Sequence, residues 1–226
     1  MKFTFYGHAC FEIEVNGKNI LFDPFITPNE KASHIDAGSL SPDYILISHG
    51  HEDHVADAID IAKRSNAKIV SNFEIVSWFG GKGIENGHPM NHGGSWNFDF
   101  GSVKYINAIH SSVLPDGSYG GNPGGFVINT GDKCFYYSGD TALTYDMKLI
   151  ADEFDLDFAV FPIGDNFTMG INDAIRASEF VNCNKVIGVH YDTFGFIEID
   201  HSDAISSFKD NGKELVLLNI GESIEL

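Results

Sequence analysis

Four apolar, strand-like runs in this chain each end in a histidine or an aspartate. The runs are Tyr-Ile-Leu-Ile-Ser-His49, Val-Lys-Tyr-Ile-Asn-Ala-Ile-His110, Cys-Phe-Tyr-Tyr-Ser-Gly-Asp140 and Lys-Val-Ile-Gly-Val-His190. In open α/β sheets, binding groups collect outside the carboxyl ends of the strands. Because imidazoles and carboxylates follow all four runs, we expect these side chains to meet in one shared site.

The first run continues into a dense cluster, His49-Gly50-His51-Glu52-Asp53-His54. Alternate residues of an extended segment point the same way, so His49, His51 and Asp53 can converge while His54 approaches from the following helical turn. Burying several imidazoles and charges without partners is costly, which favours metal binding over a purely structural role. The candidate ligands are too many for one ion and suit two: His49, His51, Asp53, His54, His110, Asp140 and His190.

Composition narrows the possible partners and the cellular location. The chain has 14 Lys and Arg against 32 Asp and Glu, a formal net charge of −18, which argues against a nucleic-acid-binding surface. Cys10, Cys134 and Cys183 form no Cys-x-x-Cys pair, so we expect free thiols in a reducing compartment. No apolar run approaches the roughly 20 residues that span a bilayer, and the N-terminal segment lacks a signal peptide's apolar core. We therefore expect a soluble cytoplasmic protein without a membrane span, and a homo-oligomer is compatible with the sequence.

The hydrophobic pattern predicts two β-rich halves, each containing helices. Strands are predicted over residues 2–6, 10–15, 19–22, 44–48, 68–71, 96–100, 103–109, 125–129, 134–137, 158–161, 185–189 and 215–218. Helices are predicted over residues 55–64, 72–79, 145–153, 172–181 and 202–211. Residues 80–94, rich in Gly, Asn and His, are predicted to form an irregular loop. Because no linker separates the halves, we expect one domain over residues 1–226, with two sheets packed together and helices on the outer faces.

The ligand cluster resembles the His-x-His-x-Asp-His signature of the metallo-β-lactamase superfamily, and His110, Asp140 and His190 follow in the family's order. A closer resemblance is to a branch of bacterial and archaeal metal-dependent hydrolases related to L-ascorbate-phosphate lactonase. The segments that carry it are Gly7-His8-Ala9-Cys10-Phe11, Asp23-Pro24-Phe25, Ser138-Gly139-Asp140-Thr141, residues 162–170 and His190-Tyr191-Asp192-Thr193-Phe194. The resemblance implies an α/β (α+β) fold, a four-layer αββα sandwich with two mixed β-sheets inside.

The resemblance also implies a role for each ligand. His49, His51 and His110 should hold one metal ion. Asp53, His54 and His190 should hold a second ion, and Asp140 should bridge the two. Imidazole and carboxylate ligands suit two divalent ions per chain, zinc first, with manganese or iron also tolerated. A hydroxide bridging the ions would be the nucleophile near neutral pH, oriented by Asp53, so Asp53 and Asp140 are the expected catalytic residues.

Further residues are expected around these ligands. His8 and Asp23 end the first and third predicted strands, where they either face the same rim or form hydrogen bonds and turns behind it. Asp23 is the expected hydrogen-bond partner of a ligand histidine, since metal-bound histidines commonly need one. The expected substrate-facing residues follow another strand and match a family segment: Asp165, Asn166 and Thr168.

These features predict a dinuclear hydrolase that cleaves an ester, lactone, amide or phosphoester bond of a small molecule. Simple charge counting leaves the loaded site at roughly +1, which favours an anionic or polarised substrate. One alternative is a non-haem di-iron redox protein of the same fold, but that branch typically has glutamate where this chain has His51. A superfamily nuclease is a second alternative, which the acidic charge and the lack of an additional nuclease domain disfavour. A non-catalytic metal protein is disfavoured by the intact ligand set, and antibiotic hydrolysis by Asp140, which true β-lactamases of this fold lack.

Overall fold

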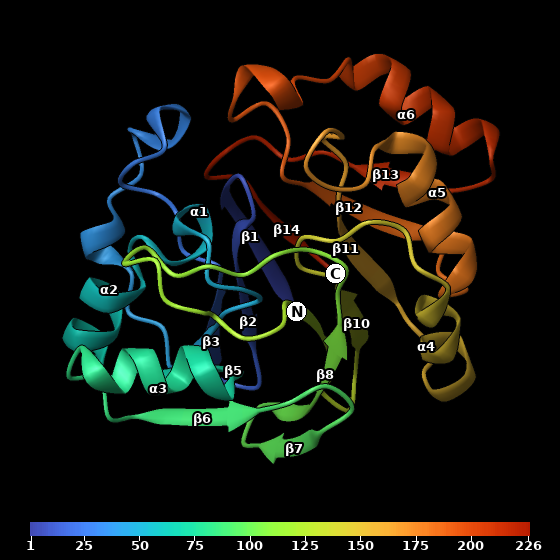
Figure 1. Ribbon diagram of the computed structural model, residues 1–226. Coiled ribbons are helices and arrows are strands. Elements are labelled where there is room, and N and C mark those ends of the chain that lie inside the picture. Colours follow the sequence, from blue (N-terminus) through green and yellow to red (C-terminus); the bar gives the residue numbers. More distant parts are fainter.

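Two seven-stranded β-sheets face each other in the computed structural model, which describes residues 1–226 (Figure 1). Helices cover the outer face of each sheet, so the layers follow the order helix, sheet, sheet, helix. Both sheets contain parallel and antiparallel strand pairs. The predicted four-layer α/β architecture with two mixed sheets is therefore confirmed.

The first sheet is built mainly from the first half of the chain, in the order β14-β1-β2-β3-β4-β5-β6. Strands β1 to β3 form an antiparallel meander, and β3 to β6 are parallel to one another. It follows that β1, β3 and β4 end at the same edge of this sheet. The strands are β1 (Lys2–Gly7), β2 (Cys10–Val15), β3 (Lys18–Phe22), β4 (Tyr44–Leu46), β5 (Lys68–Asn72), β6 (Gly87–Met90) and β14 (Ser223–Glu225).

The second sheet has the order β13-β12-β11-β10-β9-β8-β7. Strands β7 to β10 are antiparallel neighbours, and β10 to β13 are parallel. Consequently β8, β10 and β12 also run in one direction and end at one edge. The strands are β7 (Ser95–Phe98), β8 (Gly101–Asn107), β9 (Gly124–Asn129), β10 (Cys134–Tyr137), β11 (Phe158–Pro162), β12 (Lys185–Val189) and β13 (Glu214–Val216).

Six α-helices complete the fold, three associated with each sheet (Figure 1). The Asn72 side chain accepts a hydrogen bond from the Ile75 N–H at 2.9 Å, so it caps α3. None of the helices has the length and apolar character that crossing a membrane requires. The helices are α1 (Glu52–Val55), α2 (Ala58–Ser65), α3 (Phe73–Gly81), α4 (Lys148–Glu153), α5 (Ile171–Phe180) and α6 (His201–Asp210), with short 3₁₀ helices η1 (Glu30–Ala32), η2 (Ala37–Ser39), η3 (Tyr145–Met147) and η4 (Gly195–Ile197).

Stacked aromatic side chains fill much of the space between the sheets. Phe11 stacks on Phe3 and on Phe22, with ring centroids 4.8 and 4.3 Å apart. Tyr137 of the second sheet meets Phe11 and Phe22 edge to face at 5.0 and 5.6 Å. Fully burying one such ring contributes roughly 1.5–3 kcal/mol. This core therefore fixes the sheets against each other and holds their strand ends at a set separation.

The structure corrects three details of the predicted elements. Residues 80–94 are not wholly irregular, because they contain β6 (Gly87–Met90), which pairs with β5. β14 was not predicted at all. The helix predicted over residues 55–64 is divided into α1 and α2, because the Asp57 carboxylate accepts hydrogen bonds from the Ile26 and Thr27 N–H groups at 2.6 and 2.9 Å.

Candidate metal centre

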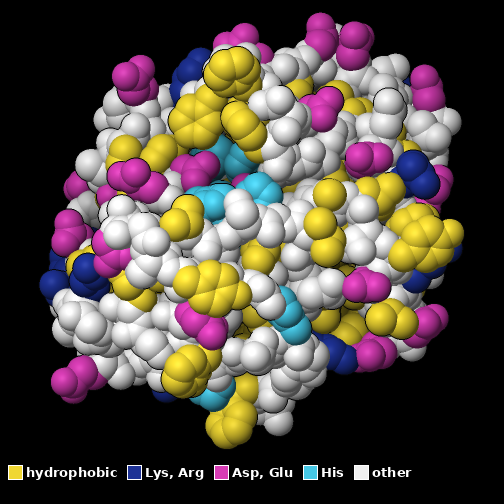
Figure 2. Space-filling model, viewed as in Figure 1, with side chains coloured by type: hydrophobic (Ala, Val, Ile, Leu, Met, Phe, Trp, Pro, Cys, Tyr) yellow, Lys and Arg dark blue, Asp and Glu magenta, His cyan; other side chains and the backbone are white.

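The predicted ligands meet where the edges of the two sheets come together. His49 follows β4 of the first sheet, and the adjoining helix α1 carries Asp53 and His54. His110, Asp140 and His190 follow β8, β10 and β12 of the second sheet. Figure 2 shows histidine side chains gathered at the molecular surface, beside acidic and hydrophobic side chains. One site therefore receives side chains from both sheets.

Three of the histidines form a first group. Ligand atoms of His49, His51 and His110 lie within 4.8 Å of one another. His49 Nε2 is 2.9 Å from His51 Nδ1, and the His110 ring centroid is 5.0 Å from each of the other two. His49 is fully buried, whereas His51 and His110 are half-buried and border a cavity.

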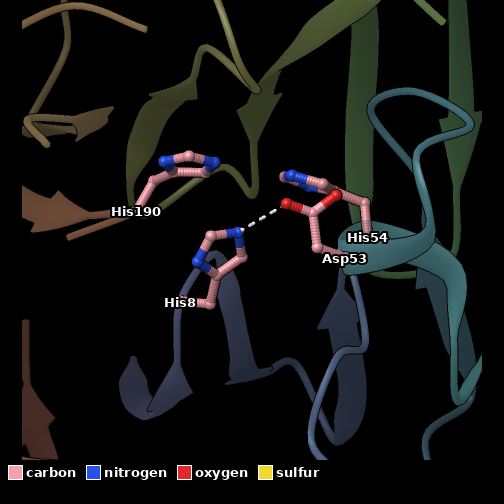
Figure 3. A group of neighbouring side chains, drawn as sticks. All are labelled: His8, Asp53, His54 and His190. Carbon is pink, nitrogen blue, oxygen red and sulfur yellow. Dashed lines mark hydrogen bonds and ion pairs between the residues drawn. The ribbon is translucent and has the colours of Figure 1, made fainter. Parts of the chain in front are cut away.

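A second group contains His8, Asp53, His54 and His190, whose ligand atoms also lie within 4.8 Å of one another (Figure 3). His8 Nε2 is 3.1 Å from Asp53 Oδ2, and His8 Nδ1 is 3.0 Å from Thr193 Oγ1. His8 and His190 both have positive φ angles, 55° and 57°, which bring their rings to a centroid distance of 4.1 Å. His8 therefore lies beside the predicted ligands Asp53 and His190 (Figure 3).

Asp140 lies between the two groups. Its Oδ2 is 3.0 Å from His190 Nε2 and 3.2 Å from His54 Nε2. The same oxygen is 3.7 Å from His110 Nε2 and 3.9 Å from His49 Nε2. Asp140 Oδ1 and His54 Nε2 are buried and lack a hydrogen-bond partner. Because buried polar atoms are nearly always paired, these unpaired atoms fit a site that holds cations.

Asp23 forms a hydrogen-bonding hub behind the ligands. Its carboxylate accepts three hydrogen bonds, from the Ser48 N–H at 2.7 Å, the Ser48 hydroxyl at 2.5 Å and the Tyr137 hydroxyl at 2.6 Å. His54 Nδ1 lies 2.8 Å from Asp23 Oδ2 and donates to it in the tautomer that leaves Nε2 unprotonated. That tautomer aims the Nε2 lone pair toward Asp140, as a metal ligand requires. Asp23 therefore lies within hydrogen-bond distance of His54, where a partner that orients this histidine is expected.

The pKa values of the histidines separate them into two kinds. Burial lowers the pKa of His49 well below its usual value and also lowers the pKa values of His51 and His110. These imidazoles are therefore neutral, the form that binds metal ions. Burial also opposes charge on His54, but the carboxylates of Asp140, Asp23 and Asp53 outweigh it and raise the pKa of His54.

The metal-free protein is expected to lose stability as the pH falls. Burial and the neighbouring His190 lower the pKa of His8 to about 3, although the hydrogen bond that His8 donates to Asp53 opposes this shift, and burial lowers the pKa of His49. Neutral His8 and His49 therefore stabilise the folded protein at pH values above about 6.5, the pKa of histidine in the unfolded chain. Each of these two contributions falls by about 2 kcal/mol between about pH 7 and pH 5. The raised pKa of His54 acts in the opposite direction and offsets part of this.

The expected net loss is about 3 kcal/mol, from about 2 kcal/mol for each of His8 and His49 less about 1 kcal/mol for His54, or about 6–12 °C in melting temperature for a chain of this size. Thermal unfolding of chelator-treated protein across this pH range measures it. A melting temperature that stays constant or rises toward pH 5 would contradict the assigned neutral state of His8 and His49.

A cavity of about 630 Å³ opens beside the ligands. Predicted residues make up part of its lining, together with Ser111 and three phenylalanines that the sequence did not single out. The predicted Asp165, Asn166 and Thr168 do not line it. Asp165 and Asn166 have φ angles of 62° and 55°, and Phe167 of the same turn lines the cavity instead. The full lining is His51, Asp53, His110, Ser111, Asp140, Phe167, His190, Phe194, Gly195 and Phe196.

Comparisons with known proteins support this fold and a metal-binding site at the edge of the two sheets. Residues 2–190 match the family model described as a beta-lactamase superfamily domain. UPF0173 metal-dependent hydrolases from Flavobacterium johnsoniae and Methylacidiphilum infernorum are 62% and 50% identical, each alignment covering 100% of both chains. The structure of Igni18, a metallo hydrolase from the hyperthermophilic archaeon Ignicoccus hospitalis, has a TM-score of 0.89 and 31% identity. That match covers 99% of this chain and 97% of the other.

The two mixed sheets, the histidine and aspartate edge and the family match define a metal-dependent hydrolase of the metallo-β-lactamase fold. Within that class, the chain belongs to the UPF0173 metal-dependent hydrolase family. The resemblance inferred from the sequence is confirmed.

Proposed function

We propose that the chain binds two divalent cations, with zinc best suited to the ligands, and hydrolyses an ester, lactone, amide or phosphoester bond of a small molecule. The position of Asp140 carries this proposal. One carboxylate oxygen lies within 3.9 Å of Nε2 atoms from four histidines, two in each group. A single carboxylate between two sets of imidazoles is suited to bridging two cations.

We assign the proposed ligands to the two cations according to the group in which each side chain lies. His49, His51 and His110 would hold one cation, and Asp53, His54 and His190 the other. His8 is better assigned to positioning Asp53, because both of its ring nitrogens already have partners in Asp53 and Thr193. These ligands, with Asp140 between the two groups, leave the cavity side open to a substrate.

Divalent cations held by these residues would supply a bound water molecule whose pKa is low enough to make it a nucleophile near neutral pH. Asp53 would orient that water. Burial opposes its charge, but His54 and His8 outweigh burial and lower the pKa of Asp53, so its carboxylate is an acceptor. His8 fixes Oδ2 of this carboxylate, and the side chain retains 27% exposure toward the cavity.

We further propose that residues 1–226 act as one domain. The inter-sheet core draws large side chains from both halves of the chain, including Phe11, Phe22, Phe126 and Tyr137. The ligands likewise come from both halves. Neither half alone would contain a complete site.

Protein purified under mild conditions is expected to contain about two divalent ions per chain by elemental analysis, as a dinuclear site requires. His190→Ala should lower this to about one, because only one ligand group loses a member. His34→Ala is the matched control, since His34 is exposed, contacts the Ile220 carbonyl and is not a predicted metal ligand. Protein that takes up no metal under any loading condition would contradict the proposal.

Screening metal-loaded protein against lactones, phosphodiesters and thioesters tests the reaction itself. Hydrolysis of at least one class, abolished by chelation and restored by metal, is the expected result. Reduction of oxygen by an electron donor, without hydrolysis of any substrate, would instead favour the di-iron alternative.

A further inference from the structure

The cavity beside the ligand groups has an aromatic wall, formed by Phe167, Phe194 and Phe196. We propose that the substrate carries an uncharged aromatic group that packs against this aromatic wall while its scissile bond lies over the metal ligands. This inference rests on the proposed function and names the substrate class for the same site.

The exposure of the wall residues is the first argument. Phe167, Phe194 and Phe196 are 49%, 38% and 78% exposed, and they are three of the four phenylalanines with large exposure in the chain. Single exposed apolar residues are ordinary, whereas an exposed apolar cluster commonly marks a binding site. Here the cluster adjoins the ligands rather than a separate surface (Figure 2).

The geometry of the wall suits a flat ring. Phe167 and Phe196 come from different segments and meet nearly edge to face, with centroids 6.3 Å apart at 77°. Phe194 extends the wall inward, since its centroid is 5.3 Å from His8 and 6.3 Å from Phe25. Aromatic pairs favour centroid distances of about 4.5–7 Å, so a ligand ring can add to this arrangement. A cavity of about 630 Å³ has room for such a ring and a reacting group.

The charges around the cavity are the second argument. No Lys or Arg is among its lining residues. Carboxylates and phosphates are usually recognised by Arg, Lys or backbone N–H groups. The chain's net charge of −18 also disfavours the approach of anions. These features favour an uncharged aromatic group over an anionic one at the aromatic wall.

Two hydroxamates provide a test that does not require the substrate, because a hydroxamate binds an open metal centre directly. Isothermal titration calorimetry on metal-loaded protein would compare acetohydroxamate with phenylacetohydroxamate. The phenyl compound is expected to bind about 10-fold tighter, which corresponds to about 1.4 kcal/mol. In the triple variant Phe167→Ala, Phe194→Ala, Phe196→Ala, this advantage should fall below about 2-fold while acetohydroxamate affinity stays unchanged.

Phe73→Ala is the matched control, because Phe73 is 61% exposed on α3 and does not line the cavity. Its hydroxamate preference should equal that of the wild type. If the triple variant does not fold, Phe196→Ala alone carries the test, since Phe196 is the most exposed of the three. Its phenyl advantage should then be reduced.

The outcomes separate this inference from the proposed function. If acetohydroxamate fails to bind protein that carries metal, the open metal centre is absent and both proposals are wrong. If acetohydroxamate binds but the phenyl group adds nothing, only the aromatic substrate class is overturned. Tighter binding of (4-carboxyphenyl)acetohydroxamate than of the phenyl compound would likewise overturn the preference for an uncharged group.

Discussion

Asp140→Asn is expected to reduce turnover of a verified substrate by about 10²-fold or more, which corresponds to roughly 2.7 kcal/mol of activation free energy. The amide has the size of the carboxylate but lacks its negative charge, and Asp140 Oδ2 is the one atom close to four ligand imidazoles. Burial opposes the charge of Asp140, but His190 and His54 outweigh it and lower the pKa of this carboxyl. Steady-state kinetics with elemental analysis of the same sample would measure both turnover and metal content.

Asp53→Asn is expected to impair turnover more than substrate binding, because Asp53 would act mainly in the transition state. Asp165→Asn provides the matched control, since its carboxylate lines a different cavity. Full activity in both the Asp140 and the Asp53 variants would show that the hydrolase mechanism is wrong.

Asp23→Ala is expected to destabilise the protein by at least about 4 kcal/mol, because it leaves four buried donors without an acceptor at about 1–3 kcal/mol each. Those donors are the Ser48 N–H, the Ser48 hydroxyl, the Tyr137 hydroxyl and His54 Nδ1. Metal affinity should also fall by about 10–100-fold, because His54 loses its orienting partner. Urea unfolding and metal titration would measure the two effects.

Asp57→Ala separates the two effects of the Asp23 variant. Asp57 is also a buried carboxylate that accepts two backbone hydrogen bonds, but its partners Ile26 and Thr27 are not predicted ligands. This control should lose stability and keep its metal affinity. An Asp23→Ala protein as stable as the wild type would show that the hub does not support the fold.

The sequence predicted the layers, and it predicted ligands whose side chains the structure brings together, because both depend on strong local patterns. Strand β4 and the cluster that follows it, from His49 to His54, combine an apolar run with closely spaced ligands. Strand β6 was missed because Gly87 and Pro89 weaken a strand signal. As an edge strand of its sheet, β6 tolerates the missing N–H of Pro89. Strand β14 has three residues and depends on pairing with β1, which lies more than 200 positions earlier in the chain.

The aromatic wall of the cavity could not be predicted from the sequence, for a different reason. Phe167 was within a recognised segment, but its hydrophobic side chain gave no sign that it would be exposed. The polar neighbours Asp165 and Asn166 seemed better suited to a substrate, yet their left-handed backbone conformations belong to the turn that presents Phe167. Whether a loop aromatic lies in a core or in a cavity depends on contacts that no local pattern encodes.

The candidate ligands come from two sheets that few backbone hydrogen bonds join at this edge: the His190 N–H donates to the His8 carbonyl at 2.7 Å, and the Gly124 N–H donates to the Ser48 carbonyl at 3.1 Å. Bound cations would therefore act as a crosslink at one edge of the sandwich, while aromatic packing joins the sheets elsewhere. Chelation should consequently permit local opening that starts at this edge. In hydrogen exchange, amides near the carboxyl ends of β4, β10 and β12 should lose protection first, and the inter-sheet core around Phe11 should be the last region to exchange.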